Sequence, residues 1–428
     1  MKLTVTMLLA VAILVSLSQF TEASVEPNDA NNLNTLGDYL RYAELNNAEL
    51  KASFQGWKIA AEQIPQAKSL PDPELTYGYA TEPTAQRYSL DVMQKFPWFG
   101  TLEAQAGSAE AEMKAAYQKY QAKKLELFNN VKNAFYEYSY LARATEITRE
   151  NLELVKHFEE VARVRYATSA TSHPDVIRAQ IEAAKLEDTL KSFEKLRYPL
   201  ATKLNSILNR PISKDLPWPK PARPGQIIVD SNTLLALMTE YNPELCALGF
   251  KINAASDNVK LAVKKSFPNV GIGVGVDAGM GENGSDRTML KAAITLPIWL
   301  DNYTAAQRQA KAQLSQAVEE KNQMENTLAA RGQQILYEYE DSGRKIHLYK
   351  DSIIPKAREM LKACETAYQA GSLDFLSLID SYRILLEYQL SYELAITENA
   401  QKLAELEMLA GTQLPTIDPA SVKNIQDK

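Results

Sequence analysis

Hydrophobic residues follow two different spacings along the first hundred residues of this chain. From Thr35 to about Gln66 they recur every three or four positions, which predicts a helix that ends before the prolines that follow. Over residues 74–80 and again over 87–96 they alternate with other residues, and Pro83 marks a turn between the two stretches. This alternation predicts a β-hairpin directly after the first helix.

A very long helical stretch comes next. Residues 101–167 contain no proline and one glycine, and apolar residues recur at coiled-coil spacing between Phe128 and Ala142. About 65 helical residues span roughly 100 Å, far more than a globular core requires. The pattern breaks between Thr168 and Pro174, and Asp175 is predicted to cap a return helix that runs to about Leu208.

The second half of the chain repeats this order. The pattern predicts a helix over 233–265, strands over 270–276 and 287–296 around a glycine-rich loop over 279–286, a long helix over 304–370 and a return helix over 374–410. Gly371, between the last two helices, is predicted to take a positive φ.

The amino-acid sequence itself is also duplicated. Asn47–Leu50 returns as Asn242–Leu245, Phe135–Tyr138 returns as Leu336–Tyr339, and Tyr166 returns as Tyr368. The separation grows from 195 to 202 positions, and we expect the insertions responsible to lie in loops. A unit of about 200 residues indicates a duplicated domain rather than a short solenoid repeat. The expected organisation is a signal peptide (1–23), a first repeat (24–210), a proline-rich linker (211–231), a second repeat (232–411) and a flexible tail (412–428).

The N-terminal residues have the pattern of a secretory signal. Lys2 precedes an apolar stretch, Met7 to Leu17, that is too short to span a bilayer as a helix. Small residues predict cleavage before Ser24, and no cysteine lies near that position to carry a lipid. The net charge of −6 argues against a nucleic-acid-binding surface.

Candidate chemistry is sparse. His157 has Glu160 at helical spacing, but two such residues on a solvated helix are more typical of a surface histidine than of a metal site. The glycines between 271 and 275 alternate with apolar residues, as in a strand, and no lysine follows them as in a phosphate-binding loop. Cys246 and Cys364 are interpreted as isolated small residues, without support for a disulfide. We therefore expect no catalytic residue, no cofactor and no metal, so that any transport would be passive and driven by a partner.

Four strands per chain cannot close a barrel, and open strand edges cannot lie in lipid. Three copies would supply twelve strands, an even number in the range of outer-membrane barrels. The glycines of the third strand would leave the lumen open. The alternation then predicts Leu290, Ala292, Ile294 and Leu296 toward lipid, and Met289, Lys291, Ala293 and Thr295 toward the lumen. Aromatic residues at the strand bases suit a membrane-interface girdle, the alternative being that they fill a small core: Phe96, Trp98, Phe99 and Trp299.

Several of these features resemble those of a known family. The order of elements, the strand ending Phe96–Pro97–Trp98–Phe99–Gly100, and the turn Tyr368–Gln369–Ala370–Gly371 followed by Leu378–Ile379–Asp380 resemble the TolC-like outer-membrane efflux channels. The resemblance covers nearly the whole mature chain. It implies a mainly α fold with a transmembrane β-barrel: a homotrimer whose long α-helical barrel crosses the periplasm below a 12-stranded β-barrel in the outer membrane.

The resemblance also implies a functional site where the long helices turn. That periplasmic tip would contact an adaptor protein and hold a gate, and the residues transferred to it are Tyr166, Asp175, Tyr368, Gly371 and Asp380. In a trimer, Asp380 would form a ring of three carboxylates, which favours cations and constricts a pore. Relatives carry another aspartate where this chain has Ser377 and a basic residue where it has Leu373, so that a looser or differently sealed tip is an equal alternative.

The implied function is that of an outer-membrane exit duct, reaching into the periplasm and working with a periplasmic adaptor and an inner-membrane pump. The strand ending resembles branches associated with export of heavy-metal cations, while drug export and type I protein secretion stay open. A periplasmic coiled-coil structural protein outside any membrane is the rival hypothesis. The two hairpins, placed identically in both repeats, argue against that rival.

Overall fold

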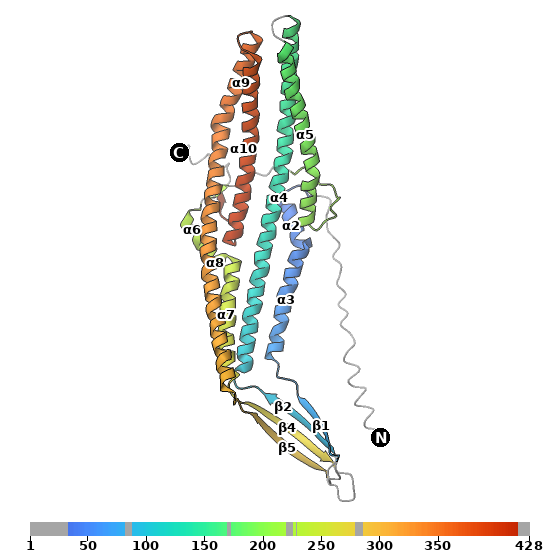
Figure 1. The fold of residues 1–428 in the computed structure, drawn as a ribbon, viewed down its shortest axis with the longest axis vertical. Helices are drawn as coiled ribbons and strands as arrows, with labels where there is room; N and C mark the ends of the chain where they lie inside the picture. The colour runs from blue at the N-terminus through green and yellow to red at the C-terminus, as the bar shows by residue number, and fades with distance from the viewer. Residues whose placement is uncertain are drawn as a thin grey trace. The chain divides into compact units, whose positions relative to one another are not determined.

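The computed structural model describes residues 33–81, 88–168, 173–219, 226–227, 229–278 and 286–417. The chain divides into two units after Leu33, and all elements below belong to the second, Asn34–Lys428. The predicted signal peptide, most of the glycine-rich loop and most of the tail lie outside the described residues. Within the second unit the sheet lies at one end of the helices, and the turns between the longest helices lie at the other (Figure 1).

The first predicted helix is two helices, α2 (Leu36–Asn46) and α3 (Ala48–Lys68). Asn47 separates them in an extended conformation, and its side chain accepts a hydrogen bond from the Leu50 amide (2.9 Å). Apolar spacing alone did not reveal this break, because a capping asparagine interrupts the backbone without interrupting the apolar face.

The long helix α4 (Thr101–Ala167) is continuous over its 67 residues, as the sequence predicts. The return helix α5 (His173–Ile207) begins three residues before the position expected from a cap at Asp175. Asp175 therefore lies inside the first helical turn, and its prediction as the capping residue was wrong. Pro174 explains the earlier start, since the first turn of a helix is where a proline is tolerated.

The second half follows the same plan. Asn242 separates α6 (Ser231–Tyr241) from α7 (Pro243–Lys264) and accepts hydrogen bonds from the amides of Glu244 and Leu245. The helices α8 (Leu300–Leu348) and α9 (Ile354–Gln369) form the long arm, and α10 (Phe375–Ala410) is the return helix. Gly371 has φ +81°, which confirms the left-handed turn predicted there.

A π-helical segment, η1 (Tyr349–Ile353), joins α8 to α9. The separation between equivalent residues is 201 at Tyr138 and Tyr339 but 202 at Tyr166 and Tyr368, so the second arm contains one additional residue between these anchors. A π-helix bonds i to i+5 and thereby takes up about one additional residue within a turn. The expectation that the insertions lie in loops was wrong for this residue, since no loop interrupts the arm there.

Four of the described strands form an antiparallel sheet in the order β1-β2-β4-β5, with β1 and β5 at its edges, and a separate antiparallel pair joins β3 (Gln226–Ile227) to β6 (Thr416–Ile417). The four strands of the sheet are β1 (Glu74–Tyr79), β2 (Tyr88–Phe96), β4 (Asn269–Ala278) and β5 (Arg287–Thr295). The hairpins of the two repeats meet between β2 and β4, where Val92 lies opposite Val274 and Asp91 opposite Gly275. The sheet is therefore a joint product of both repeats.

The register gives the sheet two unlike faces. One face is apolar and exposed, and includes Leu75, Tyr77, Leu90, Val92, Val270, Ile272, Val274, Leu290 and Ile294. The other carries the three glycines of β4 together with Glu74, Asp91, Met93, Lys95, Met289, Lys291 and Ala293. This confirms that Leu290 and Lys291 belong to opposite faces. The glycines themselves are buried, because side chains of β2 and β5 lie over them.

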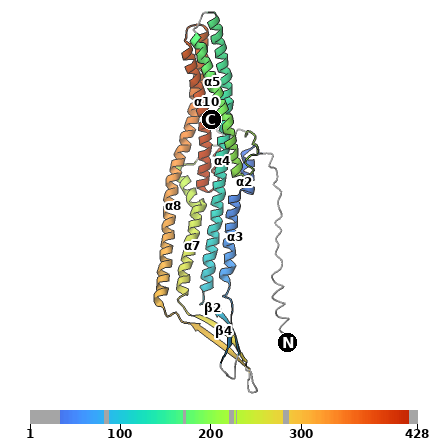
Figure 2. The ribbon, with the colours of Figure 1, turned by 45° about the vertical axis from the view of Figure 1, so that its right-hand side comes forward.

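The helix α4 lies at the centre of the packing. Near the sheet α3 and α7 pack against it, and farther away α5 and α10 do so (Figures 1 and 2). The helices α7 and α10 pack in the same order against α8. The helix α4 thus contacts shorter helices of both repeats, whereas α8 contacts those of its own repeat.

Equivalent hydrogen bonds join these shorter helices in both repeats. Asn47 Nδ2 donates to the carbonyl oxygen of Ile207 (2.8 Å), and Asn242 Nδ2 donates to that of Leu409 (2.9 Å). After each return helix the backbone takes a positive φ, at Asn209 (φ 55°) and at Gly411 (φ 74°). The duplication is thus present in the hydrogen bonding as well as in the order of elements.

Candidate functional site

The two helix turns that the sequence singles out lie at the same end of the second unit (Figures 1 and 2). Below them α4, α5, α9 and α10 share one hydrophobic cluster, which includes Phe158, Val176, Leu361, Phe375 and Tyr382. Because one core holds both hairpins, side chains from the first can reach residues of the second. We call this end of the four helices the tip.

Tyr368 is buried at the tip, with 1% of its surface exposed, and packs edge-to-face on Phe375 (ring centroids 5.3 Å apart). The guanidinium of Arg165, from the last turn of α4, lies over its ring at 4.5 Å. A cation in this position is attracted by the negative face of the ring. A Cβ atom on Gly371 would come within 3.3 Å of Arg165 Nη2, so the small residue in the turn also makes room for this arginine.

Tyr166 and Asp175 occupy the other hairpin. The Tyr166 ring is about half exposed and contacts the ring of His173 (centroids 5.2 Å apart). Asp175 is largely shielded, and its Oδ1 lies 3.6 Å from Arg178 Nη1. Tyr166 is thus available at the surface, whereas Asp175 is held within its own helical turn.

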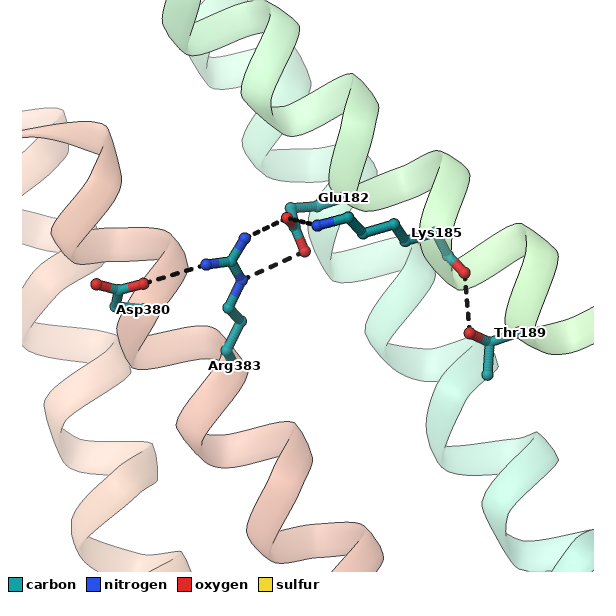
Figure 3. A network of polar contacts seen from close by, with 5 residues as sticks. All are labelled: Glu182, Lys185, Thr189, Asp380 and Arg383. Atoms are coloured by element: carbon teal, nitrogen blue, oxygen red, sulfur yellow. Dashed lines mark hydrogen bonds and ion pairs between the residues drawn. The ribbon is translucent and has the colours of Figure 1, made fainter.

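Asp380 belongs to a charged network that connects the two hairpins (Figure 3). Arg383 Nη1 lies 3.3 Å from Asp380 Oδ1, and the rest of the guanidinium binds Glu182 of α5. Lys185 Nζ also donates to Glu182 (3.0 Å), and the backbone carbonyl of Lys185 accepts from Thr189 (2.9 Å). Asp380 is therefore an exposed carboxylate with a cationic partner in its own chain.

The Glu182 carboxylate is the shielded member of this network. Burial acts to raise its pKa, but hydrogen bonds from Arg383 and Lys185 outweigh burial and lower the pKa below its usual value. The same pair raises the pKa of Arg383, chiefly through the hydrogen bond to Glu182. Both groups are consequently charged at neutral pH, and their attraction fastens α10 to α5.

The structure brings together Tyr368 and Gly371 around Arg165, and places Asp380 in the separate network of Arg383 and Glu182. Sequence reasoning missed all three of these partner residues. Glu182 and Arg383 lie 201 positions apart, and no local pattern connects them. Arg165 does have a local signal, since it directly precedes Tyr166 at the end of the helix.

Ser377, where the resemblance led us to expect an aspartate, donates from Oγ to Asp374 Oδ1 (2.5 Å). The hydrogen bond from this hydroxyl lowers the pKa of Asp374. The neighbouring Leu373 is half-buried and carries no charge. The charges of the second turn therefore belong to Asp374 and Asp380 with Arg383, rather than to the pattern expected from relatives.

The aromatic residues near the strand ends have different environments. Phe99 and Trp299 are 84% and 75% exposed, and Phe96 ends β2 partly exposed. Trp98 instead stacks on Phe267 (centroids 5.2 Å apart, planes 11° apart), and its amide donates to Asn269 Oδ1 (3.2 Å). Phe96, Phe99 and Trp299 are therefore exposed on the protein surface, whereas Trp98 packs where β2 and β4 meet the helices.

His157 is paired with Glu365 of α9, its Nε2 lying 3.6 Å from Oε1. Among the described residues no group of three or more His, Cys, Asp or Glu is placed to hold a metal ion. None of the helices in the described part of the chain is long and apolar enough to cross a membrane.

A duplicated arrangement of long paired helices, joined to a sheet with one exposed apolar face, defines a channel-type protein of the outer membrane. The chain belongs to the family described as "Outer membrane efflux protein", whose sequence model matches residues 40–210 and 234–412. The two matched ranges follow the two repeats. Membership in this family makes the protein an efflux channel and not an enzyme.

Similar proteins cover different shares of the chain. "Toxin and drug export protein A" of Aggregatibacter actinomycetemcomitans is 24% identical over 47% of this chain, and the match spans 44% of that protein. "Cobalt-zinc-cadmium resistance protein CzcC" of Cupriavidus metallidurans is 20% identical over 90% of this chain and 92% of that protein. The crystal structure of CusC aligns with a TM-score of 0.76 at 15% identity, over 89% of this chain and 93% of that one, and so has the same fold.

Proposed function

We propose that three copies of this chain form the outer-membrane exit duct of a tripartite efflux system, with a periplasmic adaptor and an inner-membrane pump as partners. The sheet would lie in the outer membrane and the helices would extend into the periplasm. The duct would be passive, because the pump supplies the energy. Its N-terminal signal peptide would be removed, with no lipid attached.

The two-faced sheet carries this proposal. Its apolar face is exposed along all four strands, which is unfavourable in water and favourable in lipid. Its edge strands β1 and β5 have no further strand beside them in the sheet. Unpaired edges are costly in lipid, and pairing β5 of one copy with β1 of the next would close a barrel. Twelve strands from three copies give such a closed structure.

We place the gate and the adaptor-binding surface at the tip. Tyr166 is exposed there for contact with a partner, while Tyr368, Gly371 and Arg165 hold the second turn. Three copies of Asp380 around a common axis would form an acidic ring. Arg383 would partly neutralise each carboxylate, so that the ring favours cations less strongly than three isolated aspartates would.

Phe96, Phe99 and Trp299 would lie at the membrane interface near the helical end of the sheet. The indole of Trp299 is favoured there because its N–H can face water while its ring contacts lipid, and the two phenylalanine rings would contact the apolar side of the interface. Trp98 would support this region from inside by stacking on Phe267.

We propose heavy-metal cations as the cargo. This is supported by the match to the cobalt-zinc-cadmium resistance protein, which spans nearly the whole chain. Deleting the gene should then raise sensitivity to cobalt, zinc or cadmium salts. Sensitivity to drugs with unchanged metal tolerance, or loss of a secreted protein, would assign the duct to a different cargo.

The first test is the mass of the detergent-purified protein together with its conductance in a planar bilayer. A trimer that gives small, cation-preferring currents is the expected result. A protein that stays soluble without detergent and gives no current would overturn the proposal.

The gate is tested by Asp380→Ala, which should raise the resting conductance by removing the acidic ring. Asp351→Ala is the matched control, since Asp351 is similarly exposed (61% against 58%) but lies in η1, away from the tip. Equal currents in wild type and Asp380→Ala would argue against a constriction at this residue.

A further inference from the structure

An ion pair on the polar face of the sheet joins two strands across the strand that lies between them. Asp91 lies in β2 and Lys291 in β5, and β4 runs between these two strands. Lys291 Nζ nevertheless donates to Asp91 Oδ1, so both side chains lie along the sheet instead of projecting away from it.

Gly275 makes this crossing feasible. A Cβ atom at that position would come within 2.9 Å of Lys291 Cε and closer still to the Asp91 carboxylate. Any larger residue in β4 would therefore force the two charged side chains off the strand. Met93 covers Gly271 in a similar way, so the glycines of β4 form a shallow strip that the neighbouring side chains fill.

The two charged residues occupy equivalent positions in the two repeats. They are 200 positions apart, as are Pro97 and Pro297, which end the second strand of each hairpin. Duplication has thus placed an acid in one hairpin and a base at the same position of the other. Residues related in this way come to the same level wherever the two hairpins alternate around a barrel.

We propose that Asp91 and Lys291 form a ring of alternating charges on the barrel wall, three acids and three bases, which leaves the pore without charge selectivity at this level. This inference rests on the proposed trimeric channel. The other charges on this face are also balanced: Glu74 binds Lys95, and Asp277 lies opposite Arg287. Selectivity would then be set by the tip and not by the barrel.

The test is the ratio of potassium to chloride permeability, obtained from the reversal potential in a KCl gradient. Lys291→Gln exposes three uncompensated carboxylates and should raise the ratio about threefold, because charges several ångströms from the axis are only partly screened by salt. Asp91→Asn should lower the ratio by a similar factor. Each variant is also measured with Asp380→Asn, so that the tip does not dominate the result.

Two compensated variants serve as controls for folding and assembly. Asp91→Asn with Lys291→Gln, and the exchange Asp91→Lys with Lys291→Asp, both restore neutrality and should return the ratio to that of wild type. Single variants with the wild-type ratio, in channels that conduct normally, would overturn the alternating ring and leave the proposed function standing. A wild-type protein that forms no channel would overturn both.

Discussion

The arms α4 and α8–η1–α9 occupy equivalent places in the two repeats, and the second arm contains one additional residue between the anchors Tyr138/Tyr339 and Tyr166/Tyr368. In α4 the helix is uninterrupted over its 67 residues, whereas the second arm contains the π-helical η1 followed by Pro355. A proline inside a regular helix clashes with the carbonyl four residues earlier, and the wider π turn relieves that clash. The inserted residue therefore makes the π turn that accommodates Pro355.

The difference follows from what surrounds each arm. The helix α4 packs against α3, α5, α7 and α10, so a bulge would disturb neighbours on several sides. The second arm packs mainly against α7 and α10, with α6 near its middle. A duplicated fold can thus diverge within a helix where packing leaves room, and not only in its loops.

The largest effect on stability is expected from deleting one residue from α4, which has no π-helical segment, rather than from the second arm, which has one. Deleting Glu150 from α4 rotates the residues beyond it by about 100° and takes apolar side chains out of the core, at a cost of more than about 4 kcal/mol. Deleting Asp351 together with Pro355→Ala should convert the second arm to a regular helix at a cost of less than about 1 kcal/mol. Thermal unfolding followed by circular dichroism measures the stability of both variants. If both lost the same stability, the π-helical segment would not be a removable insertion.

The next largest effect concerns the positive φ after each return helix. A Cβ on Gly411 would collide with the backbone of Tyr241, so Gly411→Ala should cost about 3 kcal/mol. At the equivalent Asn209, which already carries a side chain at φ 55°, Asn209→Gly should change stability by less than about 0.5 kcal/mol. Denaturant titration of both variants measures the contrast. A Gly411→Ala variant with nearly wild-type stability would mean that the backbone of Tyr241 can move to accommodate the added Cβ atom.

A smaller effect separates the two capping asparagines. Asn242 is buried and Asn47 half-buried, although both bind a carbonyl of the return helix. Asn242→Ala should therefore cost about 2 kcal/mol and Asn47→Ala about 1 kcal/mol, because a buried carbonyl loses its partner without gaining water. Melting temperatures in the order Asn47→Ala below Asn242→Ala would reverse this ranking.

The smallest effect concerns the link between the halves. Because the pKa of Glu182 is lowered in the folded protein, its stabilising contribution is present above the usual glutamate pKa of about 4.3 and is lost as pH falls through the folded value. Arg383→Ala should accordingly be less stable than wild type near pH 7, and the difference in stability should narrow as the pH falls below about 4.3. A difference that is constant with pH would show that the loss comes from packing and not from the ion pair.

Local patterns determined much of this protein from sequence alone. Apolar periodicity predicted both hairpins and the long arms, since spacing along one element depends only on that element. The duplication, the turn at Gly371 and the two faces of β5 were equally readable. The breaks at Asn47 and Asn242 were missed because a cap acts through the backbone and leaves the apolar spacing intact.

Only the tertiary structure decided which distant residues meet. The links from Arg165 to Tyr368 and from Arg383 to Glu182 each join residues about 200 positions apart. The ion pair between Asp91 and Lys291 exists because β4 enters between the two hairpins and presents a glycine there. Such contacts depend on how whole elements are placed against one another, which spacing within one element does not specify.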